Sequence, residues 1–225
     1  MKKCTALFLS ALFLLFPFSV SAQNELHVIR EGDRSSMKIA LTFDDGPHPY
    51  RTNDILDLLE KYKIKATFFV VGENVSYYSE PFKRTVALGH EIGNHTYHHK
   101  TLSKTCEETV LEEIRQTDEI IFKTAGIHPK LFRPPEGAYG ECALKAAQSM
   151  DLRMILWTVD TRDWERPPAQ TIVENVMKNV KGGSILLFHD YMHKTAHTME
   201  ALEVIIPKLL EKGYEFVTVS ELIEE

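Results

Sequence analysis

Cysteine is scarce in this sequence, with three among 225 residues. So few cysteines exclude a small domain held together by disulfides. Cys4 lies near the N-terminus, while Cys106 and Cys142 could pair in an oxidising compartment or remain two unrelated thiols. Because 44% of the residues are hydrophobic, a globular chain of this length can bury a core without cross-links.

The sequence also lacks an excess of basic residues, since 26 Lys and Arg stand against 32 Asp and Glu. Binding to nucleic acid through a basic surface is therefore disfavoured, and we expect no nucleic-acid partner. After residue 22, charged residues interrupt every apolar run, so no later segment is long enough to span a membrane. No G-x-S-x-G, Walker or dinucleotide-binding glycine pattern occurs, which disfavours a serine hydrolase and a nucleotide-dependent enzyme.

Residues 1–22 have the pattern of a secretory signal peptide. Two lysines follow Met1, residues 6–18 are apolar, and Val20-Ser21-Ala22 is a small-residue cleavage pattern. We expect cleavage after Ala22, which would place the protein outside the cell or in the cell envelope without a membrane span. An uncleaved membrane anchor is the alternative, although the apolar run is short for a span of about 20 residues.

Beyond a polar arm at residues 23–37, which we expect to be exposed, strand-like and helical patterns alternate. Strand-like runs occupy residues 39–43, 66–71, 152–157, 184–188 and 215–219. Helical patterns occupy residues 53–62, 81–88, 106–125, 140–150, 169–180 and 198–212. The alternation predicts one α/β domain over residues 38–225, in which helices wrap a mostly parallel sheet.

Chemically useful side chains follow three of these strand-like runs. They are Asp44 and Asp45, then Asp160 and Asp163, then His189 and Asp190. In α/β folds the active site gathers beyond the carboxyl ends of the strands. The positions of these residues therefore predict an active site at that edge of the sheet.

Two neighbouring carboxylates and a pair of histidines indicate a metal site. Asp44 and Asp45 repel each other, and a divalent cation would relieve this if one bound the metal and the other acted as a base. His95 and His99 are four residues apart, so a helical turn would place both imidazoles on one face, with His98 pointing elsewhere. Two imidazoles and one carboxylate are a ligand set of catalytic divalent sites. Taken singly, the carboxylates also suit a surface turn and the histidines a solvated loop.

Two further motifs carry a weaker signal. Arg133 precedes two prolines and Gly137; its forked charge can hold a carboxylate, and the glycine allows close approach of the backbone to a ligand. His189, at a strand end and oriented by a buried carboxylate, suits a general acid. For the Arg133 motif, the alternative is a proline-rich connector. For His189 it is a structural histidine, and for Trp164 it is packing in the core.

In order along the chain, five motifs read T-F-D-D-G-P, H-T-x-x-H, R-P-P-x-G, D-x-x-D-W and L-x-F-H-D. This series resembles the NodB-homology polysaccharide deacetylases, carbohydrate esterase family four. The resemblance covers about residues 38–222. It implies a distorted (β/α) barrel, in agreement with the alternation of strands and helices.

The resemblance also implies a role for each charged motif residue. Asp44 would be the general base. One divalent metal ion, zinc or alternatively cobalt, would be bound by Asp45, His95 and His99. The general acid would be His189, Arg133 would tether Asp44, and Asp163 would orient His189.

For the substrate pocket, the resemblance implies that Trp164 and Leu187 contact the acetyl methyl group. A backbone N–H near Glu136 and Gly137 would bind the oxyanion. The family often has an aromatic residue where this chain has Glu136. A backbone donor does not depend on the side chain, but sugar stacking at this position would be lost unless Tyr139 replaces it, and the added negative charge would disfavour anionic glycans.

These features predict a secreted, metal-dependent deacetylase, monomeric, that acts on N-acetylglucosamine residues. From the leader and the small single domain, peptidoglycan is the first substrate expected, and chitin oligomers are the second. Within the same chemistry, the alternative is an O-acetyl esterase acting on xylan. More distant alternatives are a non-haem iron oxygenase, which also uses two histidines and a carboxylate, and a non-catalytic cell-wall binding protein on the same scaffold.

Overall fold

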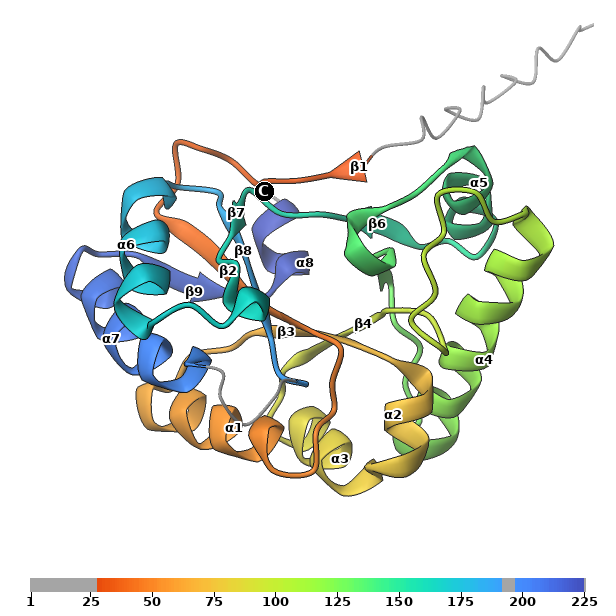
Figure 1. Cartoon of the computed structure of the whole chain (residues 1–225), viewed down its shortest axis with the longest axis horizontal. Coiled ribbons are helices and arrows are strands. Elements are labelled where there is room, and N and C mark those ends of the chain that lie inside the picture. The colour runs from red at the N-terminus through yellow and green to blue at the C-terminus, as the bar shows by residue number, and fades with distance from the viewer. Residues whose placement is uncertain (1–27, 192–196, 225) are drawn as a thin grey trace, which may run out of the picture.

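A computed structural model of the chain describes residues 28–191 and 197–224 (Figure 1). The strands are β1 (Val28–Ile29), β2 (Lys38–Asp44), β3 (Thr67–Val70), β4 (Glu91–Asn94), β5 (Leu131–Phe132), β6 (Arg153–Ile155), β7 (Val159–Asp160), β8 (Ile185–His189) and β9 (Glu215–Val217). The α-helices are α1 (Arg51–Tyr62), α2 (Gly72–Tyr77), α3 (Ser79–Ala87), α4 (Glu107–Ala125), α5 (Glu141–Ser149), α6 (Ala169–Asn179), α7 (Thr198–Glu211) and α8 (Val219–Ile223). Single turns of 3₁₀ helix cover Pro135–Gly137 and Asp163–Glu165.

The strands form one curled sheet in the order β1-β6-β5-β4-β3-β2-β8-β7, with β9 pairing to β2 outside this path. Every pairing between these strands is parallel. Parallel strands joined through helices bring their carboxyl ends to one edge. The predicted distorted (β/α) barrel of mostly parallel strands wrapped by helices is confirmed.

Helices cover the outside of the sheet. In Figure 1, α6 and α7 lie to the left of the strands, α1, α3 and α2 below them, and α4 and α5 to the right. Strand β3 (TFFV) is buried along its whole length, as expected for a strand enclosed on both faces. Phe43 stacks on Phe68 with ring centroids 5.0 Å apart and lies 6.1 Å from Phe188, so these rings fill the core directly behind the strand ends.

The six predicted helices are confirmed to within two residues at each end, as α1, α3, α4, α5, α6 and α7. Strands β4 (EIGN) and β5 (LF) were not predicted, because they are short and β4 is half polar. The predicted run at residues 152–157 is confirmed as the shorter β6, while β7 begins at Val159, beyond that run, and was not predicted. Helices α2 and α8 are short and were also missed.

The described part of the arm before residue 38 has no buried residue, as expected of an exposed segment, but it also pairs with the sheet. Strand β1 pairs with β6, and Glu31 forms a bridge with Ser184. The backbone N–H of Gly32 donates to the carbonyl of Gly183 at 2.8 Å. Backbone hydrogen bonds hold this polar segment against the sheet. Such bonds leave no pattern in the side chains, so the sequence does not predict them.

The predicted signal peptide and residues 23–27 lie outside the described residues. In the part of the chain that the structure describes, no helix is long and apolar enough to cross a membrane. Cys106 is an exposed thiol and Cys142 a partly buried one, and both are free.

Candidate active site and metal centre

The carboxyl ends of β2 and β8 place Asp44 beside His189, because the two residues are partners in the parallel register. Asp45 continues from β2 with a left-handed φ of +76°, which Asp tolerates better than most residues. A cavity of about 420 Å³ opens beside them. Of the predicted site residues, its lining contains Asp44, Asp45, His95, His99, Glu136, Trp164, Leu187 and His189.

Asp45, His95 and His99 each offer one ligand atom, and these atoms lie within 4.8 Å of one another. Oδ1 of Asp45 is 3.0 Å from Nε2 of His99 and 3.4 Å from Nε2 of His95. This oxygen is buried, and among the described residues no donor is directed at it well enough to make a hydrogen bond. Such an oxygen is costly unless a cation compensates it. The residues present therefore fit a divalent metal ion.

The chain between the two histidines is an irregular loop and not the helical turn that we expected. Thr96 and His99 have left-handed φ angles of +67° and +54°, which interrupt a helix but still turn the chain back on itself. The two imidazole rings nevertheless meet, with centroids 5.0 Å apart. His98 points away to Glu113 on α4, as predicted for a residue that is not a ligand.

The charges of the site shift the pKa values of Asp45 and His99 in opposite directions. Burial alone would raise the pKa of Asp45, but the closeness of His95 and His99 outweighs it and holds that pKa well below its usual range. The Asp45 carboxylate close beside it raises the pKa of His99, against the effect of burial. Because a metal needs a neutral imidazole, protons will compete with the metal at His99 in acidic solution.

Arg133 lies behind Asp44 and is fully buried. Its Nη1 donates to Oδ1 of Asp44 at 2.6 Å and to Oγ1 of Thr42 at 2.9 Å. Its Nε and Nη2 donate to the carbonyls of Ile155 and Leu156 at 3.3 and 3.2 Å. Burial lowers the pKa of Arg133, and the charge of Asp44 opposes this change. The guanidinium therefore fixes one oxygen of Asp44 and leaves the other for chemistry in the cavity.

His189 is held by Asp163, which is fully buried. Nδ1 of His189 lies 2.7 Å from Oδ1 of Asp163, and the backbone N–H of His189 donates to Oδ2 of Asp163 at 3.0 Å. Burial would lower the pKa of His189, but the hydrogen bond to Asp163, with the charges of Asp45 and Asp44, raises it to about 9. In the metal-free protein His189 is therefore an imidazolium at neutral pH, able to give a proton to a group in the cavity.

The predicted substrate-binding residues lie in two places. Glu136 lines the cavity with Leu187 and Trp164, and a second tryptophan that the sequence analysis did not assign, Trp157, lines it too. Gly137 is not part of the lining: it has a φ of +64°, and a Cβ there would lie 2.7 Å from the Trp157 ring. The missing side chain of Gly137 thus makes room for Trp157.

The backbone N–H of Glu136 is available as a donor. Glu136 has a left-handed φ of +59°, and its carboxylate accepts a hydrogen bond from Thr101 at 3.0 Å. The neighbouring N–H groups of Gly137 and Ala138 donate to the carbonyls of Pro134 and Pro135. No hydrogen bond uses the N–H of Glu136 among the described residues.

Asp190 supports the turn that carries Asp45, a role that sequence reasoning missed. It is 1% exposed, and Oγ1 of Thr52 donates to its Oδ2 at 2.6 Å, while its Oδ1 has no partner among the described residues. A Cβ on Gly46 would lie 2.1 Å from Oδ2, so only glycine fits there. Burial raises the pKa of Asp190 to about 7. The terminal D of L-x-F-H-D was the only available signal.

Because the pKa of Asp190 is raised, we expect the difference in folding stability between the wild-type protein and Asp190→Asn to depend on pH. Between pH 3.8 and about 7, the unfolded chain has lost this proton while the folded protein keeps it, so the folded state becomes less stable as the pH rises. We expect Asp190→Asn to remove this loss, on the order of 4 kcal/mol. Urea unfolding of both metal-free proteins from pH 4 to pH 7 measures it, and parallel stability profiles would contradict the assignment.

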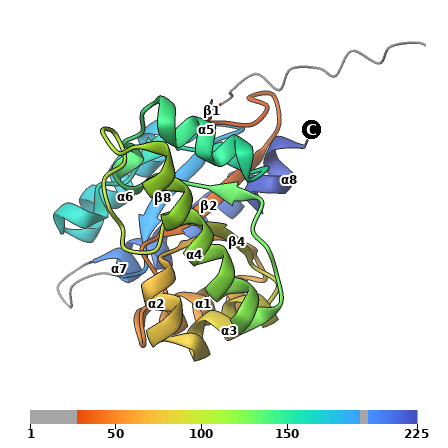
Figure 2. The same ribbon diagram turned by 90° about the vertical axis from the view of Figure 1, so that its right-hand side faces the viewer.

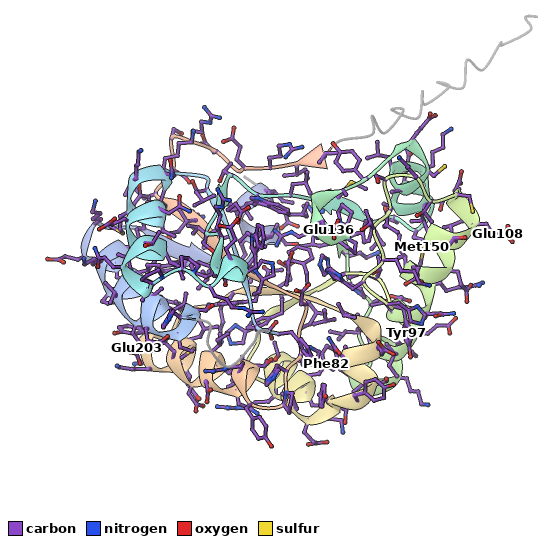
Figure 3. The ribbon with its side chains drawn as sticks, viewed as in Figure 1. Phe82, Tyr97, Glu108, Glu136, Met150 and Glu203 are labelled. Atoms are coloured by element: carbon purple, nitrogen blue, oxygen red, sulfur yellow. The ribbon has the colours of Figure 1, made fainter. Side chains whose placement is uncertain are left out.

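A larger hollow, of about 1130 Å³, lies along the outer side of α4, where Glu108 and Met150 mark it in Figure 3. Charged side chains of α4 make up much of its lining. Within the described residues, the one group of metal-ligating side chains lies in the smaller cavity instead. Glu136 lies near the centre of the molecule in the same view.

The curled parallel sheet and the triad at its carboxyl edge define a (β/α) barrel enzyme with a candidate metal centre. A family model described as polysaccharide deacetylase matches residues 31–155. The chain belongs to the polysaccharide deacetylase family of hydrolases. The resemblance deduced from the motifs is thereby confirmed.

Two relatives with known names are similar over most of this chain. The peptidoglycan-N-acetylmuramic acid deacetylase PdaC of Bacillus subtilis is 43% identical over 192 residues, which are 85% of this chain and 40% of PdaC. A peptidoglycan-N-acetylglucosamine deacetylase of Bacillus cereus is 42% identical over 187 residues, which are 82% of this chain and 87% of that protein. The chain thus spans less than half the length of PdaC and most of the Bacillus cereus protein.

Solved structures show the same fold. The peptidoglycan N-acetylglucosamine deacetylase Bc1960 superposes with a TM-score of 0.85 at 39% identity, covering 88% of this chain and 92% of that one. A family 4 acetyl xylan esterase from Clostridium thermocellum, solved with a cobalt ion, gives a TM-score of 0.77 at 38% identity, covering 82% and 89%. Enzymes of this family are metal-dependent, which agrees with the triad in this chain.

Proposed function

We propose that this protein is a secreted, zinc-dependent deacetylase that hydrolyses the acetamide of N-acetylglucosamine residues in peptidoglycan. The observation that carries the proposal is the buried, unpartnered Oδ1 of Asp45 facing two imidazoles, with Asp44 beside it. The similarity to a peptidoglycan-N-acetylglucosamine deacetylase over 87% of its length supports the substrate. The basic, apolar and small-residue pattern of residues 1–22 supports secretion.

Asp45, His95 and His99 would hold the metal ion. When bound, a divalent ion supplies a water of lowered pKa and polarises a carbonyl oxygen. Zinc suits a ligand set of two imidazoles and one carboxylate, and cobalt can take its place. The cobalt bound to the acetyl xylan esterase supports this second choice.

Asp44 would remove the proton from the attacking water. Arg133 engages Oδ1 of Asp44 at 2.6 Å, so Oδ2 is the oxygen that can receive the proton. The water oxygen forms a bond to the acetamide carbon, and the negative charge passes to the acetamide oxygen. The free backbone N–H of Glu136 can donate to that oxygen as the charge develops.

His189 would complete the reaction. The C–N bond breaks when the sugar nitrogen receives a proton, and His189, charged through its bond to Asp163, supplies it. The products are acetate and a free amine on the sugar. Leu187 and the two tryptophans of the cavity, Trp157 and Trp164, give the acetyl methyl an apolar surface.

Acetate release from a panel of acetylated glycans tests the proposal. We expect purified protein to release acetate from N-acetylated peptidoglycan, to lose this activity on treatment with a chelator, and to regain it with zinc or cobalt. Greater activity on chitin oligomers would change the substrate but not the reaction. Release only from O-acetylated xylan would replace the proposal with the esterase function of the Clostridium thermocellum neighbour. Absence of acetate from every substrate, with metal bound, would favour a non-catalytic wall-binding protein.

A further inference from the structure

We propose that Glu113 is a positioning residue that holds His99 in place to bind the metal. The inference rests on the metal site proposed above. Glu113 lies on α4, which packs beside α2 in Figure 2, and only 4% of its surface is exposed. The hydrolytic chemistry does not use this carboxylate. A buried charge needs partners, and those of Glu113 all come from the metal-ligand loop, residues 95–100.

Both oxygens of Glu113 bind this loop. Oε2 accepts the backbone N–H of Tyr97 at 3.1 Å and that of His98 at 2.9 Å. Oε1 lies 3.0 Å from Nδ1 of His98 and accepts from Nζ of Lys100 at 2.8 Å. Three of the four contacts involve Tyr97 and His98, the two residues before His99, and the fourth involves the side chain of Lys100 after it. One side chain therefore fixes the backbone immediately before that ligand.

His95 is held by contacts that do not involve Glu113. His95 directly follows β4, and its backbone N–H donates to the carbonyl of Val70 at 3.0 Å. Its Nδ1 lies 2.7 Å from the carbonyl of Arg133, a contact that orients the ring and leaves Nε2 for the metal. Among residues 28–191 and 197–224, no hydrogen bond holds Nδ1 of His99. The orientation of His99 thus depends on its backbone.

The start of the loop is held by α2. The N–H groups of Gly72 and Glu73 donate to the carbonyls of Thr96 and Tyr97, each at 3.0 Å. The φ of +54° at His99 is a sparsely populated conformation that persists only where the surroundings impose it. Glu113 supplies part of those surroundings, because it holds the backbone N–H groups of Tyr97 and His98 just before His99. Without it, the backbone can relax and carry the imidazole of His99 away from Asp45.

Zinc affinity of the metal-free protein tests this role, measured by competition with a chromophoric chelator. Glu113→Gln keeps an oxygen for the two backbone N–H groups, so its Kd should stay within about threefold of wild type. Glu113→Leu has similar size but no acceptor, so its Kd should rise about 10–100-fold. The visible absorption of bound Co²⁺ should change in the Leu variant, because one ligand is displaced.

Two control variants separate positioning from general damage to α4. Thr117→Val removes a buried hydroxyl one turn further along the helix, which donates to the carbonyl of Glu113 at 2.9 Å. Lys100→Met removes one charged donor and leaves the backbone contacts. Both should bind zinc within about threefold of wild type. A purely structural role for Glu113 would lower stability to urea and leave the zinc Kd unchanged.

Glu113→Asp provides a second variant if the Leu protein does not fold. It keeps the charge but is one methylene shorter, and its Kd should lie between those of the Gln and Leu proteins. Folded Leu or Asp proteins that bind zinc as tightly as wild type would overturn the role of Glu113 and leave the deacetylase proposal intact. A wild-type protein that binds no zinc would instead overturn the metal site itself, and this inference with it.

Discussion

Replacing Asp44 by asparagine is expected to remove most of the acetate release and to leave metal binding in place. Asn has the same shape, and its oxygen can still accept the hydrogen bond from Nη1 of Arg133, now 2.6 Å from Oδ1 of Asp44. It cannot take a proton from water, and loss of a general base costs about 10²–10⁴-fold in rate. Measured kcat should fall by that factor, while the zinc Kd should change little.

Two comparisons make this result specific to the base. Asp45→Asn removes the carboxylate of the triad, so it should lose zinc affinity and activity together. Asp118→Asn changes a carboxylate on α4 that lies 2.9 Å from His128. This variant should change neither zinc affinity nor activity. If Asp44→Asn kept its rate to within tenfold, another group would have to be the base.

Replacing Arg133 by methionine is expected to destabilise the protein by about 3–5 kcal/mol. Arg133 is fully buried and makes four hydrogen bonds, to Asp44, to Thr42 and to two backbone carbonyls. Methionine fills part of the space but leaves Asp44 as a buried charge without its partner. The free energy of unfolding, measured by urea denaturation of the metal-free protein, should fall by this amount, and the activity should fall with it.

The double variant shows how much of this loss comes from Asp44. In a protein that also carries Asp44→Asn, the remaining group is neutral, so Arg133→Met should cost less than it does in wild type. A coupling energy of about 1–3 kcal/mol is expected for residues in direct contact. Additive effects would show that Arg133 stabilises the barrel through Thr42 and the carbonyls and not through its charge on Asp44.

Much of the fold follows from local patterns, and the failures have local reasons. The helix at residues 106–125 has apolar residues on one face and Gly126 at its end, and the structure has α4 from Glu107 to Ala125, followed by Gly126 in a left-handed conformation. Strand β5 has two residues, which is too short for any periodicity. Strand β1 owes its place to backbone pairing with β6. Patterns of side chains identify long amphipathic elements and miss pairings of this kind.

The candidate site shows the same division. The residue types at the strand ends pointed to a metal, a base and an acid, and the structure brings Asp44, Asp45, His95, His99 and His189 to one cavity. The helical spacing of the two histidines predicted that their rings would meet, and they do, but through a loop with left-handed residues instead of a helical turn. Trp157 and Glu113 had no such motif signal, and Asp190 had only the last position of L-x-F-H-D, since their contacts depend on segments distant in the chain.

The sequence by itself determined which side chains end the strands and how helices and strands alternate, because turn chemistry and hydrophobic periodicity are properties of neighbouring residues. Only the tertiary structure decided that Arg133 reaches Asp44 across 89 residues of chain, and that Glu113 on α4 holds the loop of His99. Such contacts depend on which strands pair and which helix covers them. Those choices are made by the packing of the whole barrel, so no local pattern contains them.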